Sequence, residues 1–135
     1  MNQESGWVII DKPSGPTSRK IVNQVSRALK IRKVGHAGTL DPFAEGVLIL
    51  AWNKATPLVP FFQDLPKTYE VEAEFGRATD TQDRTGTTTE TFPWQHLSLD
   101  QVEEAMKPLR GVIQQVPPMY SALRHEGTRL YDLAR

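Results

Sequence analysis

Two short apolar runs stand out in the first half of the chain. They are GWVIID, residues 6–11, and GVLILA, residues 46–51, and each has the length of a buried strand. The first run stops at KPSGP, residues 12–16, where proline and glycine predict a turn. Before the second run, we expect residues 31–46 to form a loop.

A helix is predicted between the two runs. Apolar residues recur there at helical spacing, at Ile21, Val22, Val25 and Leu29. Either Thr17 or Ser18 can cap the first turn, and the pattern continues to about Lys30. One stripe of this helix should therefore pack inward.

The middle of the chain predicts three short elements. A helical segment is expected around residues 55–63. KTYEVEAEF, residues 67–75, alternates apolar and polar side chains, which is typical of a half-exposed strand. The segment 76–91 is rich in threonine and glycine and predicts a loop or the end of a hairpin.

Two further helices are predicted towards the end of the chain. Residues 98–111 begin with a capping-box pattern in Ser98 and Gln101, and Pro108 is placed to end the helix early. Thr128 is placed to cap a last helix with the sequence RLYDLAR. The chain stops inside that helix, as a fragment would.

The order of elements and the composition favour a small mixed α/β protein. Strands and helices alternate without a strict βαβ rhythm, which favours a mixed sheet over a Rossmann fold. The 135 residues are the size of one domain, able to bury about two thirds of the surface of the unfolded chain. The chain has no cysteine, no basic and apolar leader, and no apolar run near the roughly 18 residues of a membrane span. We therefore expect a cytoplasmic protein that does not enter a membrane.

Charge is unevenly distributed along a chain whose formal net charge is zero. Residues 14–40 contain no acidic residue, and their basic residues are Arg19, Lys20, Arg27, Lys30, Arg32 and Lys33. Such a stretch can form a basic face that binds a phosphate backbone. The alternative is a solvated helix face, and the composition does not decide between the two.

The segment GHAGTLDPFAEGVL, residues 35–48, offers the clearest chemistry. Glycines precede the carboxylate of Asp41 and allow close approach of another molecule, and the next acidic residue along the chain is Glu45. Pro42 biases Asp41 away from helical geometry, so the carboxylate should lie on a rigid loop that leads into a buried strand. A carboxylate held in this way can act as a nucleophile or a general base.

Asp41 also admits other interpretations. In many turns an aspartate only accepts hydrogen bonds from loop amides. A glycosidase of the usual kind needs two carboxylates, and only one is evident here. A metal site is disfavoured because His36 and Asp41 lack the further ligands that zinc requires. We therefore expect no metal and no cofactor.

The same segment closely resembles the catalytic motif of the tRNA pseudouridine-55 synthases, the TruB family. Three further stretches resemble motifs of that family, in the family's order: DKPSGPTS at 11–18, KTYEVEAEFGRATDTQD at 67–83, and QVPPMYSALRHEGTRLYDLAR at 115–135. The resemblance implies a pseudouridine-synthase-type fold, with a mixed and largely antiparallel sheet flanked by helices. It also implies that residues 1–135 are the N-terminal part of the catalytic domain, without the later strands, an arginine motif and a C-terminal RNA-binding region.

The activity implied by the resemblance is isomerisation of uridine to pseudouridine at position 55, in the T arm of tRNA. The motif aspartate, essential in that family, corresponds to Asp41. It would act either as a nucleophile at the sugar or through a glycal-type route, and the sequence does not choose between them. The alternative is a non-catalytic tRNA-binding or RNA-folding module derived from a truncated synthase. No protein partner is implied.

Further roles follow from the same motifs. Tyr69 corresponds to the family tyrosine that packs against the target base, although a tyrosine on an alternating strand can also be a core residue. His36 corresponds to the histidine that helps to place the flipped nucleotide, and Lys12 is expected to shape the wall beside the catalytic loop. Arg124 stands where the family more often has lysine. On charge alone, Arg27, Lys30, Arg32 and Lys33 are candidates for contacts with the tRNA backbone.

Two positions depart from the family pattern. Asn53 stands where the family usually has glycine, and Pro57 stands where it usually has lysine. Asparagine tolerates the left-handed conformation better than most residues, so we expect the first change to be well tolerated.

Overall fold

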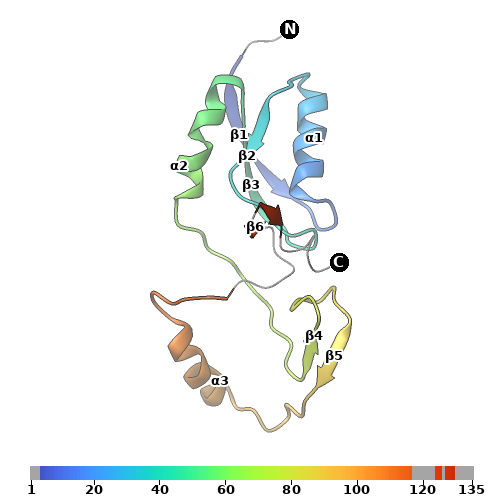
Figure 1. Cartoon of the computed structure of the whole chain (residues 1–135), viewed down its shortest axis with the longest axis vertical. Coiled ribbons are helices and arrows are strands. Elements are labelled where there is room, and N and C mark those ends of the chain that lie inside the picture. Colours follow the sequence, from blue (N-terminus) through green and yellow to red (C-terminus); the bar gives the residue numbers. More distant parts are fainter. Residues whose placement is uncertain (1–3, 117–123, 126, 130–135) are drawn as a thin grey trace. The chain divides into compact units, whose positions relative to one another are not determined.

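A three-stranded antiparallel sheet forms the centre of the first half of the molecule (Figure 1). The structure, a computed structural model, describes residues 4–116, 124, 125 and 127–129, and it divides into two compact units, Met1–Tyr69 and Glu70–Arg135. In the first unit the strand order is β1-β3-β2, with β1 at Gly6–Lys12, β2 at Val34–His36 and β3 at Gly46–Trp52. Strands β1 and β3 pair along their whole length, from Gly6 opposite Trp52 to Lys12 opposite Gly46.

Helix α1, Ser18–Ala28, packs on one face of this sheet and forms the core. Thr17 is its N-cap, because the hydroxyl of Thr17 accepts the backbone N–H of Lys20 at 3.1 Å. The fully packed residues of the core are Ile21, Val22, Leu48 and Leu50, with Val8, Ile10, Val25 and Val34 against them. The predicted helix and its inward stripe are confirmed.

The second face of the sheet is only partly covered, which corrects the prediction of two fully buried strands. Burial alternates along β1, and the outward side chains of Ile9 and Val47 are 55% and 67% exposed. Trp7 lies on this face too, and its ring contacts that of Phe62 with 5.7 Å between the ring centroids. The apolar runs resemble buried strands because both faces are apolar, but α1 covers only one of them.

The predicted loop 31–46 also needs correction, because it contains strand β2. Val34 pairs with Trp52, and His36 pairs with Leu50. A three-residue strand with a central glycine has no period that a sequence pattern could reveal. Its pairing with β3 is what defines it.

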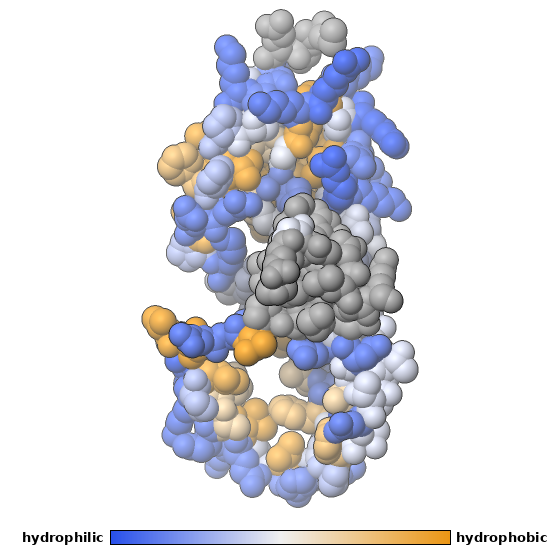
Figure 2. All heavy atoms as spheres, viewed as in Figure 1, coloured by the Kyte–Doolittle hydropathy of each residue, from blue (hydrophilic) through white to orange (hydrophobic). Residues whose placement is uncertain are grey.

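The segment after β3 is helical, as predicted. It consists of the 3₁₀ helix η1, Asn53–Leu58, and the helix α2, Val59–Gln63. Asn53 has a φ of 52°, so the left-handed conformation expected for this asparagine is confirmed. Its side-chain amide donates to the backbone carbonyl of Glu4 at 2.6 Å, which ties the start of β1 to the end of β3. Figure 2 shows hydrophobic surface over α2, where Leu58 and Phe61 are exposed.

The second unit contains the predicted hairpin and the predicted helix. Strands β4, Arg77–Thr79, and β5, Thr88–Thr91, pair with a bulge. Helix α3, Leu99–Met106, starts at the capping box of Ser98 and Gln101, and a short 3₁₀ helix, η2 at Lys107–Leu109, follows it. Pro108 lies in η2, so the α-helix ends early as expected.

Two predictions in this region are wrong. Residues 67–75 form no strand, and Val71 and Phe75 are exposed, because alternation produces a strand only where a partner strand supplies hydrogen bonds. Thr128 belongs to strand β7, Thr128–Arg129, which pairs with β6, Arg124–His125, so it does not cap a helix. The remainder of the predicted last helix, residues 130–135, lies outside the described residues.

Candidate active site

The Asp41 carboxylate lies on the loop that joins β2 to β3. The loop occupies residues 37–45 and begins where the N–H of Ala37 donates to the carbonyl of Ile49 at 2.9 Å. It ends at Gly46, opposite Lys12 at the end of β1. Asp41 therefore belongs to the same end of the sheet as the turn that leads from β1 into α1.

Lys12 is hydrogen-bonded to this loop through a buried ammonium group. The Lys12 side chain is fully buried, and its Nζ atom donates to the backbone carbonyls of Pro42 at 3.1 Å and Ala44 at 2.7 Å. A third bond, also 3.1 Å, goes to the carbonyl of Pro13. Lys12 thus supports the wall beside the loop, and all three donor positions of its ammonium point at backbone oxygens.

The turn after Lys12 makes two more bonds to the loop. The N–H of Gly15 donates to the carbonyl of Pro42 at 2.7 Å, and the hydroxyl of Ser14 donates to the carbonyl of Phe43 at 3.1 Å. Gly15 has a φ of 107°, a conformation that side chains rarely adopt, so the turn requires a glycine here. The residues that follow Asp41 are therefore bound through their backbone.

The residue that precedes Asp41 is bound as well. Ser18, in the first turn of α1, donates its hydroxyl to the carbonyl of Leu40 at 3.0 Å and accepts the N–H of the same residue at 2.9 Å. Both neighbours of Asp41 in the chain are thus tied to the segment 12–18. This segment belongs to DKPSGPTS, residues 11–18, one of the further stretches that resemble motifs of the family.

Asp41 itself is exposed at the surface of this supported loop. Its backbone carbonyl accepts the N–H of Ala44 at 3.1 Å, which closes a turn. Within residues 4–116, no side-chain hydrogen bond or ion pair involves the Asp41 carboxylate. The arrangement offers a carboxylate on a fixed backbone with both oxygens open to another molecule.

His36 lies at the start of the same loop, with its ring half-buried. The ring nitrogen Nδ1 is hydrogen-bonded to the backbone carbonyl of Gly38. A carbonyl can only accept, so Nδ1 carries the proton, and Nε2 is the nitrogen left for another partner. Gly38 has a φ of 118°, and a Cβ added there would meet nothing within 4 Å, so the loop is open beside it.

No hydrogen bond or ring contact among the described residues joins Tyr69 to this group, and the side chain of Arg124 lies outside what the structure describes. The side chain of Tyr69 is 66% exposed and lies in the segment that forms no strand. Arg124 is in β6 of the second unit. The structure thus places His36 and Asp41 on one loop that Lys12 supports, and the roles of these residues and of Tyr69 and Arg124 stay predictions.

The basic residues of the stretch 14–40 divide into two places on the first unit. Arg19 and Lys20 are exposed in the first turns of α1, next to Ser18 and the Asp41 loop. The other exposed basic residues of this stretch lie at the far end of α1 and are Arg27, Lys30, Arg32 and Lys33. Lys33 accepts the N–H of Asn53 on its carbonyl at 3.1 Å, so this group lies one β3 length, about 20 Å, from the loop. Figure 2 shows hydrophilic surface over α1.

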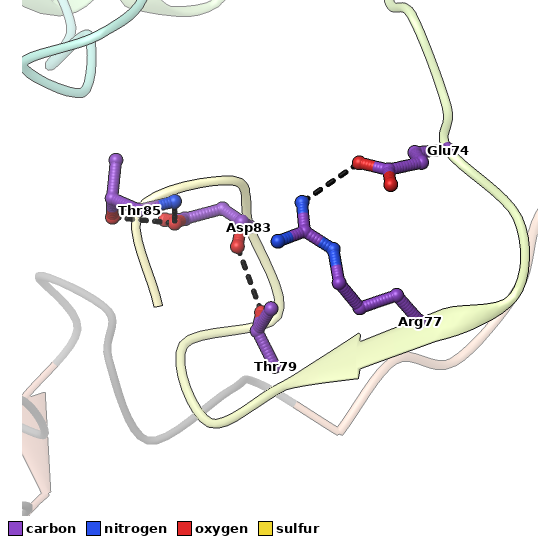
Figure 3. Close-up of polar contacts among 5 residues, drawn as sticks. All are labelled: Glu74, Arg77, Thr79, Asp83 and Thr85. Carbon is purple, nitrogen blue, oxygen red and sulfur yellow. Dashed lines mark hydrogen bonds and ion pairs between the residues drawn. The ribbon is translucent and has the colours of Figure 1, made fainter. Parts of the chain in front are cut away.

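A second polar cluster surrounds Asp83 in the turn between β4 and β5 (Figure 3). Its carboxylate accepts the hydroxyl of Thr81 at 2.9 Å and the N–H and hydroxyl of Thr85 at 2.7 and 2.6 Å. Burial alone would raise the pKa of Asp83, but the hydrogen bonds from Thr85, Thr81 and the backbone of Gly86 outweigh it and lower the pKa below 3.8. These bonds organise the hairpin turn.

Neither a metal site nor a membrane-spanning helix is found in the described part of the chain. Its His, Asp and Glu side chains form no group of three or more able to hold a metal ion. No helix there is long and apolar enough to cross a bilayer.

The site predicted from the sequence includes Asp41, His36 and Lys12 but not Ser14 and Ser18, which support the loop. The sequence predicts Ser18 only as a possible cap of α1. The signal that could have identified its role is the pair Thr17 and Ser18, because a helix needs one capping hydroxyl and has two.

The class of this protein follows from its match to a known family. Residues 26–135 match the family described as "TruB family pseudouridylate synthase (N terminal domain)". The chain therefore belongs to the TruB family of pseudouridylate synthases.

Individual relatives agree with this assignment. Over 131 residues, 97% of this chain, it is 48% identical to a tRNA pseudouridine synthase B of Caulobacter sp. (strain K31). It is 47% identical over 130 residues, 96% of its length, to the tRNA pseudouridine synthase B of Aquifex aeolicus (strain VF5). The chain spans 42% and 45% of these two relatives, which is less than half of each.

A solved structure supports the fold. The chain is similar to one chain in a crystal structure of a Cbf5-Nop10-Gar1 complex, with a TM-score of 0.58 and 28% sequence identity. The likeness covers 90% of this chain and 31% of the other. The mixed, antiparallel α/β fold predicted from the sequence is confirmed.

Proposed function

We propose that this chain carries the catalytic carboxylate of an enzyme that isomerises uridine to pseudouridine at position 55, in the T arm of tRNA. The observation that carries the proposal is the exposed Asp41 carboxylate on a loop whose neighbouring residues, Leu40 and Pro42, are both hydrogen-bonded to segment 12–18. Family membership and the names of the relatives support the reaction and the substrate class. The T arm and position 55 come from the resemblance between the motifs.

The reaction explains why a single carboxylate is sufficient. The bond between C1′ and N1 breaks, the uracil rotates, and a new bond forms between C1′ and C5. C5 then loses its proton and N1 gains one, so the product is an isomer of the substrate. Because uracil is both the leaving group and the returning nucleophile, no water has to be activated and no second acid is required. Asp41 serves either as the nucleophile at C1′ or in a glycal-type route.

The remaining residues receive supporting roles in this proposal. His36 presents Nε2 at the start of the loop and helps to place the flipped nucleotide. Tyr69 supplies an aromatic face for the extruded base, since a base removed from its stack is commonly held against such a face. Arg124 contacts the substrate, and Lys12 acts from beneath the loop. No cofactor takes part, and we place the activity in the cytoplasm.

A second candidate is a tRNA-binding or RNA-folding module without catalysis. The exposed basic group at the far end of α1, which consists of Arg27, Lys30, Arg32 and Lys33, favours RNA binding whether or not chemistry occurs. Both candidates bind tRNA, and only the first breaks the bond between uracil and ribose.

Tritium release from a tRNA transcript labelled at C5 of uridine separates the two candidates. The protein to use is this chain extended by the C-terminal remainder of the Aquifex aeolicus relative, because the chain spans less than half of such relatives. We expect release of one tritium per transcript, and none from a transcript with cytidine at position 55. Binding of tRNA without release would support the module instead. Release that continues from the cytidine transcript would contradict the assignment to position 55.

A further inference from the structure

The hydroxyl of Ser18 makes an unusual pair of contacts. It donates to the carbonyl of Leu40 at 3.0 Å and accepts the N–H of Leu40 at 2.9 Å, across 22 positions of sequence. The side chain is 2% exposed, so water does not compete for these bonds. One hydroxyl therefore satisfies both backbone groups of the residue that directly precedes Asp41.

The helix that contains Ser18 does not need this hydroxyl. Thr17 is the N-cap and accepts the N–H of Lys20 at 3.1 Å. A serine in the first turn of a helix commonly bonds to the backbone of its own helix or to water. Ser18 bonds across to the loop instead, so its contribution lies in the loop geometry.

The two sides of Asp41 are held by different elements. On the C-terminal side of Asp41, the Pro42 carbonyl accepts hydrogen bonds from the Lys12 ammonium and the Gly15 N–H. On its N-terminal side, Leu40 is hydrogen-bonded to Ser18 at the start of α1. A peptide fixed on one side can still rotate about the other, so both sides are needed to fix the direction in which the Asp41 side chain leaves the backbone.

We infer that Ser18 is a positioning residue for Asp41, acting through Leu40. The inference rests on the proposed function, in which the Asp41 carboxylate must meet the target nucleotide in a defined geometry. A displacement of about 1 Å at a reacting group can lower a rate by about 100-fold. Ser18 does not touch the substrate, so its loss should affect the chemical step more than tRNA binding.

Three variants test the inference in the chain extended by the C-terminal remainder of the Aquifex aeolicus relative. Ser18→Ala removes both bonds to Leu40. Thr17→Ala is the matched control, since it removes a hydroxyl from the same helix turn, one residue away, without touching the loop. Ser18→Thr keeps the hydroxyl and tests for rescue. Two quantities are measured for each: hydrogen–deuterium exchange at the Leu40 amide, and kcat and KM from tritium release.

The expected result is specific to Ser18. In Ser18→Ala the Leu40 amide should exchange at least about tenfold faster, and kcat should fall by about 10- to 100-fold with KM within about twofold of the parent. Ser18→Thr should recover most of kcat. Thr17→Ala should lower the melting temperature and leave both the Leu40 exchange and kcat near the parent values.

Two outcomes would overturn the inference. One is a Ser18→Ala variant whose kcat matches that of Thr17→Ala, and the other is a loss that appears in KM alone. A parent protein that releases no tritium would instead contradict the proposed function. In that event the Leu40 exchange rates still decide whether Ser18 holds the loop, since they do not depend on activity.

Discussion

Replacing Lys12 with methionine should destabilise the first unit by about 2 kcal/mol. The change keeps an unbranched apolar chain in the buried position and removes the ammonium that donates to the carbonyls of Pro13, Pro42 and Ala44. Pro42 retains the N–H of Gly15, so two carbonyls lose their partner. An unpaired buried polar group costs about 1–3 kcal/mol. Pro13 is exposed and Ala44 is half-buried, so water replaces part of each bond and the lower value of about 1 kcal/mol applies to each.

Urea unfolding followed by tryptophan fluorescence can measure this change in the first unit alone. The chain has three tryptophans, and Trp7 and Trp52 belong to the first unit. A Trp94→Phe background therefore removes the signal of the second unit. Lys20→Met is the matched control, because Lys20 is exposed on α1, and it should stay within about 0.5 kcal/mol of the parent. If Lys12→Met were as stable as Lys20→Met, the ammonium would not be holding the loop.

Three other predictions concern RNA binding, pH and the uncovered sheet face. Replacing each residue of the basic group at the far end of α1 with glutamine should weaken tRNA binding. The slope of the logarithm of the binding constant against the logarithm of the salt concentration should also become shallower, by roughly 0.7 to 0.9 for each lost phosphate contact. An unchanged slope would mean that these residues form a solvated face that does not contact the RNA. Because folding lowers the pKa of Asp83, its carboxylate stabilises the protein above pH 3.8, and this contribution is lost as the pH falls further. Asp83→Asn should therefore lower the urea midpoint more at pH 7 than at pH 3. Equal shifts at the two pH values would contradict the cause given for the lowered pKa. Extending the chain with the C-terminal remainder of the Aquifex aeolicus relative should raise both the melting temperature and tritium release, since Ile9 and Val47 leave apolar surface exposed. A cooperative transition at high temperature, together with full activity, in the 135-residue chain alone would contradict this.

The elements that sequence reasoning found correctly are those with a local signal. Helix α1 has an apolar stripe, including Ile21 and Val22, that fits one face of a sheet. Helix α3 has a capping box contained within four residues, and the capping hydrogen bonds form as the pattern predicts. Such signals depend on neighbours in the chain, so they can be recognised without knowledge of the tertiary structure.

The elements that it missed depend on partners far away in the chain. Strand β2 exists because Val34–His36 pairs with β3, and the sequence of these three residues does not predict that pairing. Residues 67–75 show the reverse case, since they have the alternation of a strand and no strand pairing. Alternation describes the two faces of a segment, whereas a strand also needs an edge to pair with.

The candidate site follows the same division. Asp41 could be singled out because glycine and proline around it predict a rigid loop. The bonds that hold this loop could not, because Ser18 and Leu40 are 22 positions apart and Lys12 and Ala44 are 32 apart. The sequence therefore yields Asp41 as a candidate, and the structure adds how the loop that carries it is held.

The most direct test of the account is the activity of Asp41→Asn in the extended chain. The substitution removes the charge of the carboxylate and keeps its size, and Asp64→Asn provides a matched control at another exposed carboxylate of the first unit. We predict that Asp41→Asn abolishes tritium release from C5 while tRNA affinity stays within a few-fold of the parent, and that Asp64→Asn behaves as the parent. Tritium release by Asp41→Asn at the parent rate would contradict the assignment of Asp41 as the catalytic residue.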